Sequence, residues 1–537
     1  MNRIIGIDLG TTNTCAASVS NKIPRVIPIE GGYSTMPSCV AVAIDGSVLV
    51  GQSAKEQMIL APQRSIYGVK RLVGRQFNSR TVQEYRRYFS YDIIAGEHGE
   101  AAIRIGERIW TCDEVQSRIL SQVKRYAEIH LGEDVPEVVI AVPAYFSDHQ
   151  RALVKQAGER SGWNVRKVIN EPTAAALAYG FNRGFDQKVL VYDLGGGTFD
   201  VSILEVTGNV FQVIATGGDI FLGGAGFDNR VLTWMVEQFR RETKMDVLED
   251  PRALQRLRDA AERAKIELSL LANTQVKLGG LVERRGKLVD LDLVLDRETL
   301  NRLTSPLVDR TITLVDELLA SVGLAKESID EIILVGGQTR MPLVVDRLTN
   351  HFGKGPRKGV HPDESVALGA ALYADSLAKI DAVTLLDTLS TPVGVASSKG
   401  TIEVVVPRNA RLPHAVTIAL PATRDAQGNG VIEVYQGDAG PVSGGDYLGT
   451  LVYPAEKLTG HEGALLQVTF ALDAEGMLEV RATHDPASEP QQVQLATIER
   501  PSLPQDGVDA SVRAPEAPTA GGRSGLRDLV KGLWGGR

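Results

Sequence analysis

The sequence contains 537 residues, of which 43% are hydrophobic and 23% charged, a composition typical of globular proteins and a length that predicts more than one domain. The formal net charge of −8 argues against a broad basic surface for nucleic acid or anionic lipid, so no nucleic-acid partner is expected. Three cysteines without a CxxC spacing argue against a disulfide framework or structural zinc and indicate a reducing compartment.

The N-terminus and the overall hydropathy pattern bear on location. The first residues run directly into a strand-like apolar segment rather than into a signal peptide. No run is long and apolar enough for a transmembrane segment. We therefore expect a cytoplasmic protein.

The chain divides into four regions by pattern. Short β-branched runs alternate with longer amphipathic patterns over 1–380, which predicts an α/β domain. Residues 379–387 contain an apolar stretch bracketed by acids, which predicts that the interdomain linker, expected at 381–390, docks rather than being passive. Short alternating segments over 391–500 predict an all-β sandwich. The Pro-, Ala- and Gly-rich composition that begins residues 501–537 predicts a disordered tail with a short amphipathic end.

The predicted strands follow this division. In the α/β domain, the runs 4–9, 138–142 and 189–193 are expected to be buried strands. In the second domain, strands are expected at 401–406, 416–420 and 431–435, and a hairpin is expected from 467–470 and 477–480.

Two turns of the same kind follow two of these strands. Asp8-Leu9-Gly10-Thr11-Thr12 ends the first strand, and Asp193-Leu194-Gly195-Gly196-Gly197-Thr198 ends the strand at 189–193. An Asp-Gly pair alone is a common turn former, but two matched copies predict two related lobes facing each other across a cleft. The glycines let backbone N–H groups approach an anion, and the threonines add hydroxyl donors, so both turns are expected to bind phosphate. Asp8 and Asp193 would repel phosphate, so we expect them to hold Mg²⁺ and its waters.

A third turn is predicted where the strand at 332–335 ends in Gly336 and Gly337, before a helix with Pro342 in its first turn. Without side chains, the two glycines would let a flat nucleoside pack against the backbone, and Arg340 could cover the adenine. The alternative is a diglycine turn that serves only tight packing.

The helix predicted over 257–269 has one apolar face and a second face formed by Glu262, Lys265 and Ser269. A solvated charged face is the common explanation of such spacing. Ser269, which lies between apolar neighbours, favours a cradle for a nucleoside instead.

Five segments together resemble the signatures of the seventy-kilodalton heat-shock chaperones, the Hsp70 family, and especially its bacterial form. They are residues 6–13, 142–146, 169–176, 193–200 and 335–342. The resemblance covers nearly all of residues 3–390. It implies an actin-like, ribonuclease H-like ATPase domain with two lobes, joined to a β-sandwich domain that binds peptides.

The resemblance implies a role for each matching position. Lys70 matches the lysine that reaches the γ-phosphate and steadies the attacking water; a solvated surface cation is its alternative. Glu171 matches an acid that organises Mg²⁺, K⁺ and water; an acid at a helix start is its alternative. The implied catalytic residues are Lys70, Glu171, Thr198, Asp8, Asp193 and Asp200, with Asp8, Asp193 and Asp200 at the metal. The implied ATP/ADP-binding residues are Gly10, Thr11, Thr12, Asn13, Gly195, Gly196, Gly197, Glu262, Lys265, Ser269, Gly336, Gly337, Gln338 and Arg340.

The resemblance also implies partners and interdomain coupling. Pro143, Arg151 and Glu171 match the family's interdomain switch. Residues 383–387 resemble the linker that docks on the ATPase domain when ATP is bound, with Thr384 in place of a usual leucine. The implied partners are unfolded or extended peptide segments, a J-domain co-chaperone and a nucleotide exchange factor.

Several positions depart from the family pattern. Lys167 stands where the bacterial chaperone has an arginine used by its J-domain partner, which keeps the charge but loses the planar fork. Ala225 and Gly226 replace an acidic pair, which puts the contribution of their loop to domain movement in doubt. Ser398 and Gly430 align with larger apolar residues of the peptide pocket, so a shallower and more polar pocket is expected.

The family's helical lid is not expected, because only the tail after Arg500 remains. Residues 524–534 within that tail have one apolar face flanked by basic residues, so a partner groove or a membrane surface could receive them. A frayed end without function is the alternative.

The leading hypothesis is an ATP-dependent molecular chaperone with ATPase activity, which binds exposed apolar peptide segments under control of ATP binding and hydrolysis. The alternative is a specialised Hsp70-like ATPase or regulatory binding module without general client binding. A small-molecule kinase is disfavoured because a β domain takes the place of a recognisable sugar site.

Overall fold

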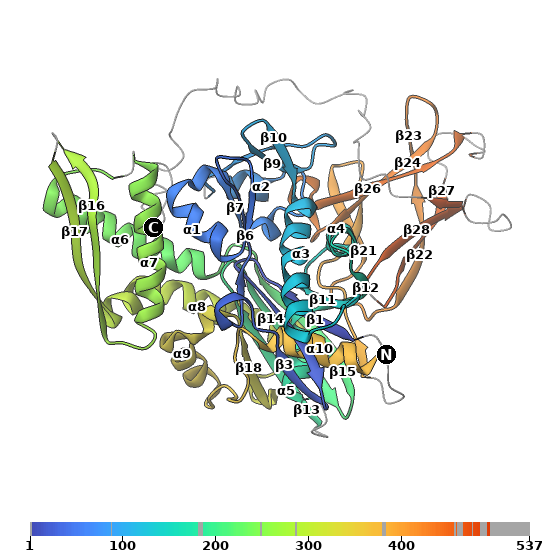
Figure 1. Ribbon diagram of the computed structural model, residues 1–537. Helices are drawn as coiled ribbons and strands as arrows, with labels where there is room; N and C mark the ends of the chain where they lie inside the picture. Colours follow the sequence, from blue (N-terminus) through green and yellow to red (C-terminus); the bar gives the residue numbers. More distant parts are fainter. Residues whose placement is uncertain are drawn as a thin grey trace.

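The computed structural model describes residues 3–86, 89–180, 186–247, 250–284, 287–377, 383–455, 458, 465–474, 476–483 and 491–493. The predicted tail at 501–537, with its amphipathic segment at 524–534, lies outside the described residues. Figure 1 shows the α/β elements arranged around two large sheets. We call residues 3–180 the first half of this α/β region and residues 186–377 the second half.

The first half contains a mixed sheet. Its strands are β1 (Ile4–Leu9), β2 (Asn13–Ser20), β3 (Ile23–Val26), β4 (Met36–Pro37), β11 (Glu137–Val142) and β12 (Asn164–Asn170). The order is β12-β11-β1-β2-β3, with β4 paired to β2. β1 pairs in parallel with β11 and antiparallel with β2. The predicted strands at 4–9 and 138–142 are confirmed.

The second half contains a sheet with a matching centre. Its strands are β13 (Asp186–Leu194), β14 (Phe199–Thr207), β15 (Val210–Asp219), β18 (Glu331–Val335) and, from beyond the second half, β19 (Thr384–Leu386). β13 pairs in parallel with β18 and antiparallel with β14, which repeats the surroundings of β1. The internal repeat predicted from the two Asp-x-Gly turns is confirmed by this topology.

Two helices, α5 (Glu171–Gly180) and α10 (Ser365–Ser376), join the halves. They pack against each other, and their buried faces share one apolar core with strands of both sheets. A side chain at Gly369 would place its Cβ 1.6 Å from the Ala174 carbonyl oxygen, so only glycine permits this approach of the two helices. The close contact holds the two sheets at a short separation.

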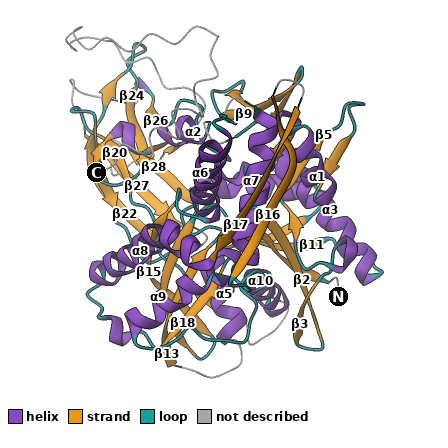
Figure 2. Cartoon of the chain, turned by 90° about the vertical axis from the view of Figure 1, so that its left-hand side faces the viewer, coloured by secondary structure: helices purple, strands orange, loops and turns teal. Residues whose placement is uncertain are grey.

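The remaining α/β elements cover the outer faces. In the first half they are α1 (Gln52–Leu60), α2 (Arg80–Tyr85), α3 (Cys112–Leu131), α4 (Asp148–Arg160), the sheet of β5 (Cys39–Val42), β6 (Val48–Val50) and β7 (Ser65–Tyr67), and the sheet of β8 (Asp92–Ala95), β9 (Ala101–Ile105) and β10 (Arg108–Thr111). In the second half they are α6 (Gly224–Thr243), α7 (Pro251–Glu267), α8 (Arg297–Ser321), α9 (Pro342–Phe352) and the hairpin of β16 (Asn273–Arg284) and β17 (Lys287–Asp296). Figure 2 shows this hairpin on the side that faces the viewer, with α7 behind it.

The described residues between 393 and 493 form two antiparallel sheets with a common core. The first comprises β20 (Val393–Ala396), β21 (Thr401–Val406), β23 (Thr423–Arg424), β24 (Gly430–Gln436), β25 (Gly440–Pro441) and β26 (Asp446–Tyr453). The second comprises β22 (His414–Pro421), β27 (Leu465–Leu472), β28 (Leu478–Thr483) and β29 (Gln491–Val493). The strands predicted in this region are confirmed, as is the hairpin of β27 and β28. In Figure 1 this β region lies on the opposite side of the molecule from the β16–β17 hairpin.

No helix in the described part of the chain is both long and apolar enough to cross a membrane.

Candidate functional site

The two Asp-x-Gly turns meet at the cleft between the halves. The turn after β1 and the turn after β13 come so close that a Cβ at Gly196 would lie 2.0 Å from the Thr12 hydroxyl oxygen. Glycine at this position therefore lets the two backbones approach one another. The hydroxyl of Ser38 donates a hydrogen bond to the Gly10 carbonyl at 2.7 Å, which holds the first turn from behind.

The turns enclose a cavity of about 100 Å³. Most of the predicted site residues line it. They are Asp8, Gly10, Thr11, Thr12, Asn13, Lys70, Glu171, Asp193, Gly195, Gly196, Gly197, Thr198, Gly336 and Gly337. The cavity therefore brings together backbone donors, hydroxyl groups, carboxylates and one cation, the groups that bind a polyphosphate with a metal ion.

Lys70 and Glu171 form a buried ion pair beside this cavity. Lys70 is 5% exposed and Glu171 is 8% exposed, and the ammonium group contacts the Glu171 carboxylate. The burial of Lys70 excludes the alternative of a solvated lysine. Glu171 does begin α5, and it also contacts Lys70. Among the residues that line this cavity, Lys70 is the one cation.

Burial and mutual repulsion make these carboxylates hard to ionise without a cation. Burial, then Glu171, raises the pKa of Asp8 to about 7. Burial and the same neighbour raise the pKa of Asp200 to about 7. Burial followed by Glu171 and Asp200 raises the pKa of Asp193 well above its usual range. Lys70 opposes the rise at all three carboxyl groups but does not cancel it.

This excess of negative charge fits Mg²⁺, whose positive charge would stabilise the ionised carboxylates. No group of three or more acidic, histidine or cysteine side chains among the described residues is arranged to hold a metal by itself. Of the predicted metal residues, Asp8 and Asp193 line the cavity and would hold Mg²⁺ together with its waters and phosphate oxygens, whereas Asp200 does not line the cavity.

The raised pKa values predict a pH dependence of stability in the nucleotide-free protein. Because Asp8 and Asp200 keep protons that the unfolded chain would release, the free energy of unfolding should fall as the pH rises from about 4 to about 7. Urea unfolding across this range should show a steeper fall for the parent than for Asp200→Asn, which has no charge to form. Parallel curves would contradict the prediction.

The structure brings together only some of the residues that were predicted to bind the nucleoside. Glu262 and Lys265 line a second cavity of about 180 Å³ next to the first. Lys265 is buried and pairs with Asp228 at 2.9 Å, whereas Glu262 pairs with Lys55 at 3.7 Å. The solvated face that the helical spacing also allowed is therefore wrong for Lys265.

The predicted diglycine turn follows β18, with Gly336 at a φ of 81°. A Cβ there would lie 2.5 Å from the Leu194 carbonyl oxygen, so the tight packing of this turn requires glycine, as the packing alternative predicted. Gln338 is buried, and its side-chain oxygen lies near the position of a Cβ at Gly224. Arg340 is half-exposed and pairs with Asp363 at 3.3 Å.

The structure separates Ser269 from the two cavities. Its hydroxyl donates to the Lys265 carbonyl at 3.4 Å at the end of α7, and it is not among the residues that line either cavity. The helix predicted over 257–269 ends at Glu267, so Ser269 lies in the turn that follows it.

Thr35, Asp363 and Arg71 are among the residues of the cleft that were not predicted. Thr35 and Asp363 line the first cavity, and Arg71 lines the second. Asp363 comes from the segment before α10, far along the chain from every predicted turn. The adjacency of Arg71 to Lys70 was the only available signal, because none of the three lies in a repeated motif.

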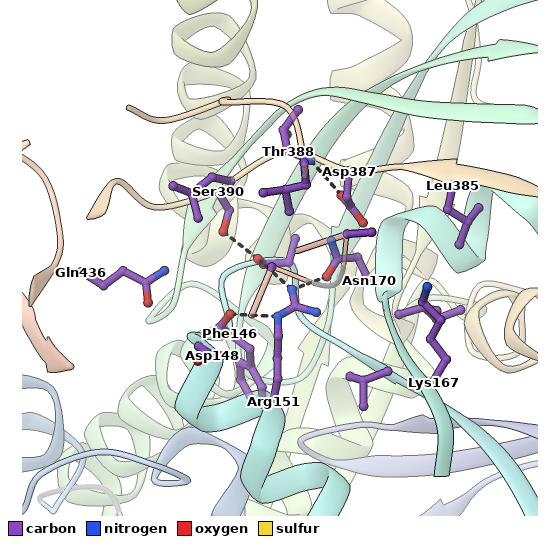
Figure 3. A pocket seen from close by; sticks show the side chains of 17 residues that line it. Phe146, Asp148, Arg151, Lys167, Asn170, Leu385, Asp387, Thr388, Ser390 and Gln436 are labelled. Carbon is purple, nitrogen blue, oxygen red and sulfur yellow. Dashed lines mark hydrogen bonds between the residues drawn. The ribbon is translucent and has the colours of Figure 1, made fainter. Parts of the chain in front are cut away.

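A further cavity of about 50 Å³ lies where the linker meets the α/β region, and Figure 3 shows the side chains around it. β19 extends the second sheet by pairing in parallel with β15, so the predicted docking of the linker is confirmed. Thr384, the departure from the family's leucine, is exposed, whereas Leu385 packs against the central core.

Asp387 and Arg151 lie together in this cavity (Figure 3). Burial raises the pKa of Asp387, and the positive charge of Arg151 opposes that rise. Arg151 also donates to the Asn170 side chain and to the Phe146 carbonyl. The Ser390 hydroxyl donates to the Ala144 carbonyl at 2.6 Å, which ties the start of the β region to the α/β region.

Consecutive residues connect this cavity with the cleft. Pro143 lines the cleft cavity, and its neighbour Ala144 lines the linker cavity. In the same way, Glu171 lines the first and Asn170 the second. A shift of either backbone segment would therefore change the shape of both the cleft cavity and the linker cavity.

The two residues expected in the peptide pocket have different environments. Ser398 is exposed in the turn between β20 and β21. Gly430 is buried in β24, where a Cβ would lie 3.0 Å from the Ala422 Cβ and 3.1 Å from the Leu458 Cδ1. Neighbouring apolar side chains therefore already occupy the space beside Gly430.

The chain is similar to a known protein family and to a known chaperone. A family model described as Hsp70 protein matches residues 4–522. Chaperone protein DnaK of Stenotrophomonas maltophilia (strain R551-3) is 42% identical over 509 residues, which cover 92% of this chain and 78% of that protein.

Proposed function

The chain belongs to the Hsp70 family and is an ATP-hydrolysing molecular chaperone, and from this premise we propose that nucleotide in the cleft controls peptide binding by the β region through the docked linker. The two halves of the α/β region correspond to actin-like lobes, and the two sheets from residue 393 onward to a peptide-binding sandwich. The alternative of an ATPase without general client binding is not favoured.

In the proposed site, each turn binds phosphate with its backbone. Gly10, Thr11 and Thr12 supply donors from one side of the cavity, and Gly195 to Gly197 supply them from the other. Glu262 and Lys265 would bind the nucleoside, because they line the second cavity. Gln338, Arg340 and Ser269 line neither cavity, but Arg340 pairs with Asp363 of the first one, so the proposal has the least support at Ser269.

The proposed catalytic groups act by position and charge. Lys70 supplies a buried positive charge where charge develops on the γ-phosphate, and Glu171 orients the lysine. Thr198 lines the phosphate cavity, and its side chain hydrogen-bonds Asp200. Mg²⁺ would neutralise the phosphates when bound, and K⁺ is a second proposed cation for the crowded carboxylates.

The coupling proposal rests on two contacts that the linker makes with the α/β region. β19 is a strand of the second sheet, and Asp387 faces Arg151 at the end of that strand. The linker cavity and the nucleotide cavity share two backbone segments, at 143–144 and 170–171. A change in the cleft would therefore alter the stability of docking, and docking would set the state of the β region.

The test is binding of a panel of fluorescent apolar peptides to the full chain with ATP and with ADP. We expect saturable binding of several unrelated peptides in ADP and faster release in ATP. Binding with equal release rates in the two nucleotides would contradict the coupling. Failure to bind any peptide while ATP is hydrolysed would support the alternative of an ATPase without general clients.

We propose that a J-domain co-chaperone binds near the linker cavity, because Lys167 lines it. The positive charge of Lys167 also opposes the raised pKa of Asp387. A lysine offers a point charge instead of a planar fork, so a partner suited to a bidentate contact would bind more weakly. A nucleotide exchange factor is the second proposed protein partner.

A further inference from the structure

Tyr85, at the end of α2, makes a contact between the two halves of the α/β region. Its side chain is 2% exposed. Its hydroxyl donates a hydrogen bond to the Ile220 carbonyl at 2.6 Å. Its ring centroid lies 4.8 Å from that of Phe221. Ile220 and Phe221 belong to the loop after β15, so a first-half tyrosine is held by a second-half loop.

The start of α6, which directly follows that loop, supports one of the two phosphate turns from behind. The Gly224 amide donates to the Gly195 carbonyl at 2.9 Å, and the Ala225 amide donates to the Gly196 carbonyl at 2.9 Å. The loop therefore cannot move far without disturbing the turn. Through this loop, Tyr85 is connected to the backbone that lines the phosphate cavity.

Arg71 provides a second connection to the same turn. Its guanidinium carbon lies 5.2 Å from the centre of the Tyr85 ring, a cation–π contact. Its Nη2 donates to the Gly196 carbonyl at 3.4 Å. A Cβ at Gly197 would lie 2.4 Å from that nitrogen, so the guanidinium rests directly on the turn. Tyr85 thus supports the phosphate turn through the loop and through Arg71.

The protonation state of Tyr85 suits the role of a donor. Burial raises the pKa of its hydroxyl, and the positive charge of Arg71 opposes the rise without cancelling it. The hydroxyl therefore stays protonated at neutral pH. The Ile220 carbonyl accepts this hydrogen bond in a buried environment. Separating the halves would therefore leave the hydroxyl and the carbonyl exposed to water or without a hydrogen-bond partner.

We propose that Tyr85 is a positioning residue that holds the two halves together over the phosphate turn and thereby slows the release of bound ADP. For the cleft to open, the Tyr85 hydrogen bond, the ring contact and the Arg71 contact must separate. The proposal rests on nucleotide binding in the cleft. It concerns a residue that lines neither the first nor the second cavity of the cleft.

The experiment measures dissociation of methylanthraniloyl-ADP from the full chain after addition of excess unlabelled ADP. Tyr85→Phe keeps the ring and removes the hydroxyl, so release should become roughly three- to tenfold faster, as expected for losing one buried hydrogen bond. Tyr85→Ala also removes the ring contacts and should release the analogue faster than Tyr85→Phe.

Tyr91→Phe is the matched control. Tyr91 is buried, and its hydroxyl donates to the Tyr67 carbonyl at 2.6 Å, but both residues lie in the first half. The chemical change and the burial are the same, whereas the bridge between the halves is absent. We therefore expect this variant to release the analogue at the parent's rate.

Three outcomes would overturn the proposal. In the first, Tyr85→Phe releases the analogue at the parent's rate. In the second, Tyr91→Phe accelerates release as much as Tyr85→Phe, which would mean that any weakening of the first half has the same effect. In the third, the parent fails to bind the analogue saturably; this result alone would also overturn the nucleotide site.

Discussion

Lys70→Ala is expected to lower the rate of ATP hydrolysis by about 10²- to 10³-fold, the effect of losing one preorganised charge at the reacting phosphate. Lys70 is the cation within the carboxylate-lined cavity, and it is buried against Glu171. The many backbone donors of the two turns remain, so ATP binding should be largely retained. Single-turnover hydrolysis and equilibrium binding of ATP with Mg²⁺ measure the two effects separately.

Lys188→Ala is a suitable control for this variant. Lys188 pairs with Glu205 at 3.3 Å on the surface of the second half, away from the lining of the cleft. Its removal also deletes one positive charge and one ion pair, but the hydrolysis rate should not change. Equal hydrolysis by Lys70→Ala and the parent would contradict the role of Lys70.

Arg151→Met is expected to abolish the acceleration of peptide release by ATP. Arg151 is 9% exposed, and its charge offsets the burial of Asp387 at the end of the docked linker. Removing one partner of a buried charge pair costs about 3–5 kcal/mol. Such a loss shifts the docking equilibrium by at least about 100-fold towards the undocked linker. Hydrolysis chemistry itself should persist, because Arg151 does not line the nucleotide cavity.

The measurement for this variant is the release rate of a labelled apolar peptide before and after ATP is added. Arg166→Met is the control, because Arg166 is a half-exposed arginine that pairs with Glu137 in the same half. The control should keep the full response to ATP. A normal ATP response in Arg151→Met would show that linker docking does not depend on this charge.

The sequence by itself determined the elements whose signals are local. Each phosphate turn was recognisable because a strand, an acid and glycines follow one another within ten residues, and the structure places both turns at one cavity. The β strands and the β27–β28 hairpin were predictable from alternation and turn residues. The apolar composition of residues 383–387 indicated docking, because exposing such a segment would be unfavourable.

The tertiary structure alone decided which distant residues complete the sites. Tyr85 and Ile220 are 135 positions apart, and Ser390 and Ala144 are 246 apart. No periodicity connects such pairs, since their contact depends on how the two halves and the β region pack. Ser269 was predicted from helical spacing, but the helix ends two residues earlier, at Glu267. Local pattern determines which groups a turn or helix offers, whereas packing determines which of them meet.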